Sequence, residues 1–515
     1  MNGAESLVRT LVESGVDTCF ANPGTSEMHF VAALDKVEEM RCVLGMAETV
    51  VTGCADGYGR MAEKPAATLL HCGPGFANGM SNIHNARRAK TPMVNIVGDH
   101  ATYHVAYDAP LTTDIEGMAH TVSNWVRTTP ESAAVGADAA LAVQQARSAP
   151  GHISTLILPA DASWNEGGVV AKPLPIPAPR AADAPVVAAV AAVLQRREVS
   201  VLLMSGRALT EAGLLAAQRV AQHTGARLLT TNQVPRMARG RGRVPVNRLP
   251  YALDAALSVL ADVQHVILVG AKPPTQFFAY PGRPSLTAPA NAQIHVLAEG
   301  AVDEVLALTQ LAESLGAPKT VTVPVIGEAP QIVRGRFSPE AFGTTLAALM
   351  PEQAIVAEDA VTSGRPLFAQ TYNAQPHDWL QLTGGSIGHG LPCAAGAAVA
   401  CPDRQVVCLQ ADGAGMYPLQ ALWTQAREQL NVVNIIFANR VYKILQGELV
   451  AVGAQSGHAS KALFDLARPE LNWVKLAAGM GVEGVRVDTL EGFADVFSAA
   501  CRRRGPFLIE LMIQA

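Results

Sequence analysis

The feature that most constrains the fold is a repeated alternation of short apolar runs with longer segments of helical pattern. The runs are rich in β-branched residues and lack strict polar–apolar alternation, which is typical of strands buried on both faces. Helical segments between such strands predict βαβ units and parallel sheets. The expected strands cover residues 66–70, 93–97, 154–158, 199–204, 266–269, 405–410, 432–437 and 507–513.

Two irregular stretches divide the chain. Residues 172–185 contain five prolines in fourteen positions, which disfavours regular structure and predicts an extended linker. Residues 320–342 are loop-like and end at a helix start near Ser338-Pro339-Glu340. With 515 residues, 49% of them hydrophobic, the chain has room for about three domains. We expect an α/β fold of three doubly wound parallel-sheet domains, at 1–170, 185–320 and 338–515.

Charge and hydropathy argue against several classes of partner. The net charge is −5, so we expect no nucleic acid partner. The longest weakly polar stretch, 390–402, is too short to cross a bilayer, so we expect no membrane association. Residues 1–8 include Glu5 and no basic residue, which predicts no signal peptide. The 8 cysteines form no C-x-x-C pair, and this scattered use favours a cytoplasmic protein.

Two polar side chains follow neighbouring expected strands in the C-terminal third. Asp412 comes directly after strand 405–410, and Asn439 follows strand 432–437, with one crossover helix between them. Adjacent parallel strands bring such side chains to the same sheet edge, where their oxygens suit Mg²⁺ or Ca²⁺. Small residues at 413–415 let backbone N–H groups approach an anion. The pattern predicts a metal-bridged diphosphate site, and the alternative is an ordinary βα turn capped by Asp412.

Two residues in the N-terminal third suit proton transfer. Glu48 is the one charged residue in the small, apolar run that precedes Asp56. Its carboxylate is expected to be desolvated at the start of an apolar helix, which raises the pKa of a carboxyl group toward the range that proton transfer needs. His71 ends an expected strand beside a Gly-Pro-Gly turn, where an imidazole could protonate a carbanion or alkoxide. The alternatives are a capping or surface glutamate and a structural histidine bonded in a turn.

These segments resemble motifs of thiamine diphosphate (ThDP) enzymes. The Asp412–Asn439 region is similar to the family's Gly-Asp-Gly and Asn-Asn motif, with Ala411 and Ala438 in place of the first Gly and the first Asn. Glu48 followed by the Ala-Asp-Gly-Tyr-Gly-Arg string at 55–60 resembles the element that activates the cofactor in decarboxylases and carboligases. The resemblance implies pyrimidine-binding, central and diphosphate-binding domains, with ThDP and Mg²⁺ as cofactors.

The resemblance also assigns roles to residues. Glu48 would protonate N1′ of the aminopyrimidine, and Asp412, Asn439 and the Val441 carbonyl would bind the metal. In residues 382–392, the Gly385 carbonyl would accept from the 4′-amino group, and Ile387 would lie under the thiazolium ring. The other expected cofactor contacts are Pro23, Gly24, Thr362, Ser363, Gly413, Ala414, Met416 and Tyr442. Since this family builds each site from two subunits, a homodimer or homotetramer is implied.

The expected pocket resembles that of benzoylformate decarboxylases. Residues 21–30 are similar to their Asn-Pro-Gly-Ser turn, with Thr25 in place of the serine that orients the substrate carboxylate, and His71 matches their catalytic histidine. The resemblance implies a 2-oxo acid decarboxylase and carboligase. Its enamine on ThDP would be protonated or added to a second carbonyl.

Three alternatives remain open at this point. One is an acetolactate synthase-type carboligase, since the whole chain resembles that group. Another is a 2-hydroxyacyl-CoA lyase, because five arginines between 236 and 248 could hold a phosphate. A third is a non-catalytic ThDP-fold binding subunit, which Ala411 and Ala438 motivate. FAD is not expected, because the central third lacks the motifs of flavin-containing relatives. Its 270–284 stretch instead offers Phe277, Phe278 and Tyr280 as pocket walls or core.

Overall fold

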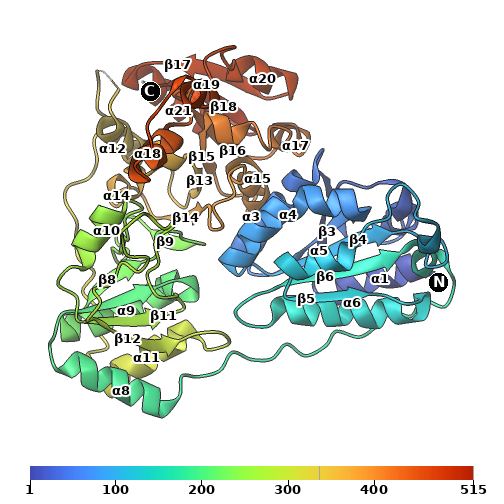
Figure 1. The fold of residues 1–515 in the computed structure, drawn as a ribbon, viewed down its shortest axis with the longest axis horizontal. Coiled ribbons are helices and arrows are strands. Elements are labelled where there is room, and N and C mark those ends of the chain that lie inside the picture. Colours follow the sequence, from blue (N-terminus) through green and yellow to red (C-terminus); the bar gives the residue numbers. More distant parts are fainter. Residues whose placement is uncertain (336, 514–515) are drawn as a thin grey trace.

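The computed structural model describes residues 1–335 and 337–513, which form three sheets with helices on both faces (Figure 1). All eight expected strands are present, with ends shifted by two residues at most. The α/β prediction is confirmed. Residues 172–183 form no helix and no named strand, as the prolines predict. Among the described residues, no helix has both the length and the hydrophobicity that a membrane crossing requires.

The N-terminal sheet is entirely parallel, and its four inner strands are buried on both faces. Its order is β2 (Arg41–Leu44), β1 (Thr18–Ala21), β3 (Ala66–His71), β4 (Met93–Asp99), β6 (Ile153–Pro159) and β5 (Trp125–Thr128). Leu69 and Ile96 pack with α1 (Gly3–Glu13) and α6 (Ser132–Arg147) on one face. Leu70 and Val97 face the opposite way, toward α3 (Glu48–Ala62), α4 (Cys72–Ala89) and α5 (Ile115–Val122). Alternate strand residues therefore supply two separate cores.

The central sheet is also parallel. Its order is β10 (Asn247–Arg248), β8 (Arg227–Thr230), β7 (Ser200–Met204), β11 (His265–Val269) and β12 (Gln293–Ala298). One face packs against α8 (Ala184–Gln195), α9 (Glu211–Thr224) and α11 (Glu304–Ser314), and the other against α10 (Leu253–Leu260). Thr210 caps α9 by accepting a hydrogen bond from the Gly213 N–H, and Gly225 ends that helix in the left-handed conformation.

The C-terminal sheet carries one strand that corrects the expectation of a purely parallel sheet. Its order is β17 (Glu483–Val487), β18 (Phe507–Met512), β16 (Val432–Ala438), β15 (Val406–Ala411), β13 (Ile355–Asp359), β14 (His377–Gln381) and β9 (Met237–Arg239). β9 comes from the central third and pairs antiparallel with β14, Met237 opposite Trp379. It covers the otherwise open edge of β14, because an uncovered edge exposes unpaired backbone groups.

Helices cover both faces of this sheet as well. The faces carry α15 (Gly390–Ala400), α17 (Ala421–Arg427) and α20 (Trp473–Gly479), and, opposite them, α12 (Pro339–Leu349) and α21 (Leu490–Cys501). The predicted helix start is confirmed, since the Ser338 side chain caps α12 by accepting from the Ala341 N–H.

Helices α3 and α15 join the N-terminal and C-terminal sheets into one shared core. They approach so closely that a Cβ added to Gly57 would lie 2.0 Å from the Cys393 carbonyl oxygen, and one added to Gly396 would lie 1.8 Å from the Cys54 carbonyl oxygen. Glycine is required at both positions for this packing. The contact fixes how the two outer thirds of one chain sit against each other.

Candidate active site

The two predicted metal ligands meet at the carboxyl edge of the C-terminal sheet. β15 and β16 are neighbouring parallel strands, and Asp412 and Asn439 follow their ends. Asp412 is 3% exposed and accepts from its neighbour Gly413 N (2.8 Å, Oδ1) and from Arg440 N (2.6 Å, Oδ2). The Asn439 Oδ1 accepts from Val441 N at 3.0 Å. Burial raises the pKa of Asp412, while the backbone N–H groups lower it.

The other predicted contacts of this edge lie on short segments around the pair. They are Thr362 and Ser363 on α13 (Val361–Gly364), half-buried Ile387 before α15, Gly413 and Ala414 on α16 (Asp412–Gly415), Met416 after it, and Val441 and Tyr442 before α18 (Lys443–Ala451). The Tyr442 ring packs on Gly413, since a Cβ there would lie 2.3 Å from Tyr442 Cε1. The structure thus gathers these residues where parallel sheets bind ligands.

Residues 382–389, here named the cradle, are organised by a carboxylate that the sequence analysis missed. Asp359, at the end of β13, accepts through Oδ2 from the backbone N–H groups of Gly388 (2.9 Å), His389 (3.0 Å) and Gly390 (3.3 Å). The carboxylate therefore satisfies orphan donors at the start of α15. Burial raises the pKa of Asp359, against the lowering effect of these contacts. The tandem acids Glu358-Asp359 ending a buried strand were the available signal.

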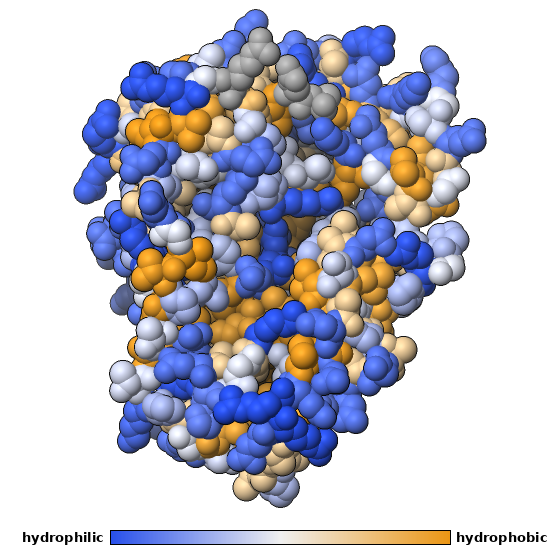
Figure 2. Space-filling view, turned by 90° about the vertical axis from the view of Figure 1, so that its left-hand side faces the viewer, coloured by the Kyte–Doolittle hydropathy of each residue, from blue (hydrophilic) through white to orange (hydrophobic). Residues whose placement is uncertain are grey.

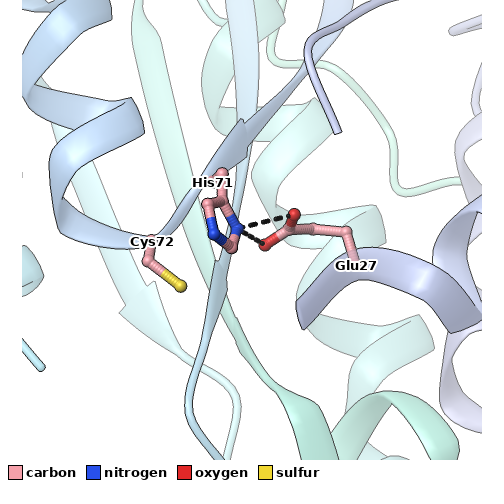
Figure 3. Close-up of side chains that lie close together, drawn as sticks. All are labelled: Glu27, His71 and Cys72. Atoms are coloured by element: carbon pink, nitrogen blue, oxygen red, sulfur yellow. Dashed lines mark hydrogen bonds and ion pairs between the residues drawn. The ribbon is translucent and has the colours of Figure 1, made fainter. Parts of the chain in front are cut away.

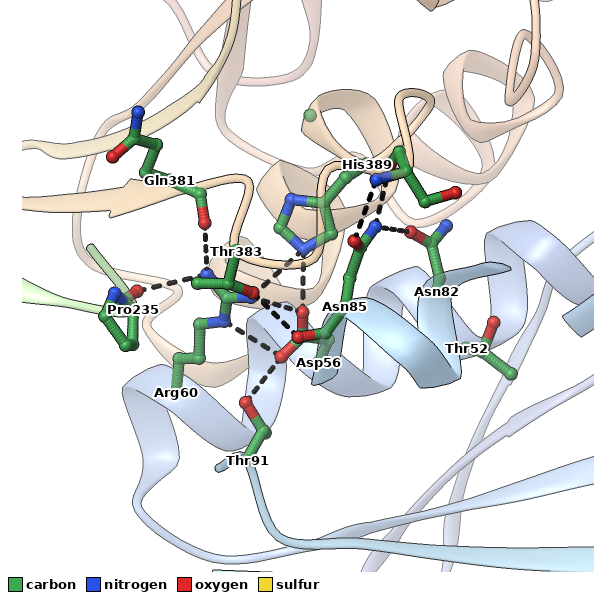
Figure 4. A network of polar contacts seen from close by, with 12 residues as sticks. Thr52, Asp56, Arg60, Asn82, Asn85, Thr91, Pro235, Gln381, Thr383 and His389 are labelled. Atoms are coloured by element: carbon green, nitrogen blue, oxygen red, sulfur yellow. Dashed lines mark hydrogen bonds and ion pairs between the residues drawn. The ribbon is translucent and has the colours of Figure 1, made fainter. Parts of the chain in front are cut away.

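The cradle is fastened to helix α4 of the N-terminal third (Figure 4). The Asn85 Nδ2 donates to the Ser386 carbonyl at 2.8 Å, and the Asn82 Nδ2 donates to the Gly388 carbonyl at 3.2 Å. Gly385 has φ +77°, in the left-handed region that favours glycine. Glycine at 385 therefore permits the left-handed backbone conformation of the cradle, and the bonds from α4 hold the cradle in place.

Glu48 begins helix α3 and is 8% exposed. Asn78 of α4 donates to its Oε2 at 3.3 Å. A Cβ added to Gly75 would lie 2.9 Å from Glu48 Oε1 and 3.3 Å from His71 Cβ. Glu48 and His71 therefore flank Gly75 and belong to one cluster, although they are 23 positions apart in the sequence.

His71 ends β3 and pairs with a buried glutamate that the sequence analysis missed (Figure 3). Its Nδ1 lies 3.0 and 3.1 Å from the two carboxylate oxygens of Glu27, which is 2% exposed. Glu27 also accepts from Gly24 N at 2.7 Å, and Ser26 Oγ lies 3.2 Å from the same imidazole nitrogen. A carboxylate at Nδ1 favours the proton there and leaves Nε2 for exchange.

The turn that carries Thr25 lies beside this cluster. Pro23 and Thr25 are exposed, while Gly24 lies directly against His71, since a Cβ on Gly24 would fall 2.1 Å from His71 Cγ. The predicted N-terminal residues are thus gathered at one sheet edge. Among the described residues, no hydrogen bond or ion pair joins Glu48 or His71 to Asp412 or Asn439 of the same chain.

A buried ionic network connects α3 with the cradle (Figure 4). Asp56 is fully buried and binds Arg60 through two bonds of 2.9 and 2.6 Å, Thr91 Oγ1 at 2.5 Å and His389 Nε2 at 2.7 Å. Burial opposes ionisation of Asp56, but Arg60 and His389 hold its pKa well below the usual range. Burial also opposes the charge of His389, yet Cys393 and Asp56 raise its pKa to about 9.

The arginine-rich segment 236–248 is mainly structural. Only Arg241 is both exposed and, within the described ranges, without a side-chain partner. The others are Arg236 (Glu63 Oε1, 2.9 Å; Asp378 Oδ1, 3.2 Å), Arg239 (over the Phe368 ring, 3.5 Å), Arg243 (His377 O, 2.7 Å) and Arg248 (Glu358 Oε2, 3.7 Å). Four of the five arginines therefore have partners within the chain.

A cavity of about 710 Å³ lies between the central sheet and α14 (Leu367–Gln370). Figure 2, viewed from the side of the molecule that carries α10 and α14, shows a hollowed surface with apolar patches. The cavity is lined by residues that include Arg248, Tyr251, Arg365 and Tyr372. None of the predicted site residues lines this cavity, so it is separate from the Glu48–His71 cluster and from the Asp412–Asn439 pair.

Two family descriptions match this chain, one in its N-terminal third and one in its C-terminal third. The chain matches the families described as "Thiamine pyrophosphate enzyme, N-terminal TPP binding domain" over residues 1–143 and "Thiamine pyrophosphate enzyme, C-terminal TPP binding domain" over residues 363–511. Thiamine pyrophosphate is the same compound as thiamine diphosphate. The first match contains Glu48 and His71, and the second contains Asp412 and Asn439.

Two curated relatives span nearly the whole chain. "Putative acetolactate synthase large subunit IlvX" of Mycobacterium tuberculosis is 51% identical over 100% of this chain and 99% of its own length. Benzoylformate decarboxylase of Pseudomonas aeruginosa is 26% identical over 97% of this chain and 96% of its own.

A solved structure shares the fold. The Rhodococcus jostii RHA1 thiamine diphosphate-dependent 4-hydroxybenzoylformate decarboxylase superimposes with a TM-score of 0.88 at 22% identity, covering 100% of this chain and 99% of the other. The chain therefore belongs to the thiamine diphosphate enzyme family, as an acetolactate synthase-like or 2-oxo acid decarboxylase enzyme that makes or breaks carbon–carbon bonds.

Proposed function

We propose that this protein is a ThDP- and Mg²⁺-dependent 2-oxo acid decarboxylase with carboligase ability. The observation that carries the proposal is the Glu27–His71 pair beside Glu48, because it supplies a histidine poised for proton transfer next to the cofactor-activating carboxylate. When bound, ThDP supplies a nucleophilic carbon and an electron sink for loss of CO₂ from a 2-oxo acid.

The C-terminal edge fits a metal-bound diphosphate. Asp412 and Asn439 offer hard oxygen ligands that their own backbone contacts already orient, and the Val441 carbonyl would complete the protein's share. A Cβ at 413 would meet the Tyr442 ring and Leu466 Cδ1, so this position suits glycine. Since the Gly413 N–H already donates to Asp412 Oδ1, the Ala414 N–H would be the one that an anion approaches. Gly385, Ile387, Thr362 and Ser363 would provide further contacts, and FAD is not part of the proposal.

The N-terminal cluster fits proton transfer at the other end of the cofactor. Glu48 keeps Oε1 free of any described hydrogen bond, so it can hold or give a proton at that atom. Glu27 keeps His71 Nε2 available for the reacting carbon, and the exposed Thr25, with Pro23 and Gly24, would contact substrate or cofactor. Glu48 would act on cofactor bound by a partner subunit, which requires a homodimer or homotetramer.

A screen of 2-oxo acids with ThDP and Mg²⁺ tests the proposed function. We expect CO₂ release with an aldehyde as the main product from at least one acid, and an acyloin when an aldehyde acceptor is added. Acetolactate as the main product from pyruvate would favour the acetolactate synthase-type alternative, which the M. tuberculosis relative supports. No consumption of any 2-oxo acid by cofactor-loaded protein would contradict both and favour the non-catalytic alternative.

Replacing Glu27 tests the role of the histidine pair. In Glu27→Gln one of the two oxygens that face His71 Nδ1 becomes an NH₂ group, so the imidazole loses its orientation and we expect kcat to fall about tenfold to hundredfold. Exposed Glu38 gives the control Glu38→Gln. Unchanged kcat in Glu27→Gln would show that the pair takes no part in the reaction.

A further inference from the structure

Helix α18 lies on the surface shortly after Val441, a proposed metal ligand, and none of its residues is buried. One carboxylate ties it to the central third of the chain. Glu448 accepts from the Tyr251 hydroxyl at 2.9 Å through Oε1 and from the Tyr280 hydroxyl at 2.8 Å through Oε2. We name these three residues the clasp, since they link two segments of the central third to a C-terminal helix.

The clasp is connected to the cradle through an aromatic chain. The Tyr251 and Phe277 rings have centroids 5.5 Å apart, and Phe277 lies on Gly385, where an added Cβ would fall 2.4 Å from Phe277 Cζ. Phe278 packs edge-on against Phe277 at 4.8 Å. Both phenylalanines nevertheless keep 40% and 53% of their surface exposed. They therefore present an open apolar wall beside the expected thiazolium position.

The charges around the clasp favour its hydrogen bonds. Burial, followed by the nearby Glu448 carboxylate, raises the pKa of both tyrosines, so both hydroxyls carry their protons and donate at neutral pH. The Arg365 guanidinium lies over the Tyr251 ring, 4.1 Å from its centroid. Hydrogen bonds to a charged acceptor are stronger than neutral ones, so one glutamate can hold an otherwise exposed helix.

We propose that Glu448 is a positioning residue that, through Tyr251 and Tyr280, seats Phe277 on the cradle and closes the apolar end of the substrate site. The clasp thereby selects 2-oxo acids with a bulky apolar side chain over pyruvate. The selectivity rests on the proposed function above, whereas the closure itself does not depend on it.

Amide hydrogen exchange in the cofactor-free protein tests the closure. Glu448→Ala should speed exchange about tenfold in residues 443–451 and 273–286. The double variant Tyr251→Phe/Tyr280→Phe should reproduce this effect. Glu448→Gln should largely restore protection, because the amide can accept one hydroxyl proton and donate to the other oxygen. Exposed Gln446 on the same helix provides the control Gln446→Ala. Unchanged exchange in Glu448→Ala would overturn the proposal, whatever the enzyme's reaction is.

Steady-state kinetics with phenylglyoxylate and pyruvate test the selectivity. Glu448→Ala should raise KM for phenylglyoxylate about tenfold and change kcat less than about twofold, with a smaller change for pyruvate. Equal changes for both acids, or a loss confined to kcat, would overturn the selective role. If neither acid reacts even with wild-type protein, the proposed function fails with these probes, while the exchange result still decides the closure.

Discussion

Replacing Glu48 by glutamine should lower kcat by about a thousandfold, within the range for loss of a general acid or base. Glutamine matches the shape of the buried side chain and can keep its contact with Asn78, but it cannot exchange a proton at the cofactor. Turnover of the best 2-oxo acid from the screen, measured at saturating ThDP and Mg²⁺, checks this prediction.

The matched control is Glu131→Gln, which alters an exposed glutamate at the start of α6, another helix that packs on the N-terminal sheet. It should leave turnover unchanged, and both variants should unfold at the wild-type temperature. Full activity in Glu48→Gln would show that this carboxylate takes no part in the reaction.

The second large effect is a loss of folding stability when the buried Asp56 is replaced. In Asp56→Ala the buried Arg60 loses its carboxylate and His389 loses its partner, so the free energy of unfolding should fall by about 3–5 kcal/mol. Urea unfolding followed by circular dichroism measures the change. Exposed Asp35 gives the control Asp35→Ala, which should change stability by less than about 0.5 kcal/mol. A similar loss in both variants would refute the special role of the network.

The same network predicts a dependence of stability on pH. The pKa of His389 is raised from 6.5 to about 9, so protonated His389 stabilises the fold fully below pH 6.5. This stabilisation, about 3 kcal/mol in total, is lost as pH rises through 9. The depressed pKa of Asp56 acts in the opposite sense, and its contribution is lost only in strong acid. His389→Gln should therefore lack the alkaline decline of the unfolding midpoint.

The sheets and the metal edge could be predicted because their signals are local in the sequence. A buried parallel strand is a short apolar run, and the residue after it lies at the carboxyl edge, so Asp412 and Asn439 were placed together from their spacing alone. The antiparallel strand β9 carried no such signal, since three residues within an arginine-rich stretch do not resemble a strand.

The missed residues are those whose partners are distant in the chain. Glu27 is 44 residues from His71, and Asp56 is 333 residues from His389. Their roles depend on burial and pairing, which only the packing of α3, α4 and α15 creates. Glu448 is similar, because its two tyrosines come from the central third. The periodicity of the sequence predicts helices and strands. Pairs of side chains that are distant in the chain can be identified only once the packing of those helices and strands is known.

A crystal structure of the protein with ThDP and Mg²⁺ would show whether Glu48 and the Asp412–Asn439 pair of two subunits form one site. We expect Mg²⁺ on the side-chain oxygens of Asp412 and Asn439, and the carboxyl group of Glu48 of one subunit within hydrogen-bond distance of the pyrimidine ring held by the other. Cofactor bound elsewhere, or a Glu48 carboxylate pointing away from that ring, would contradict this expectation.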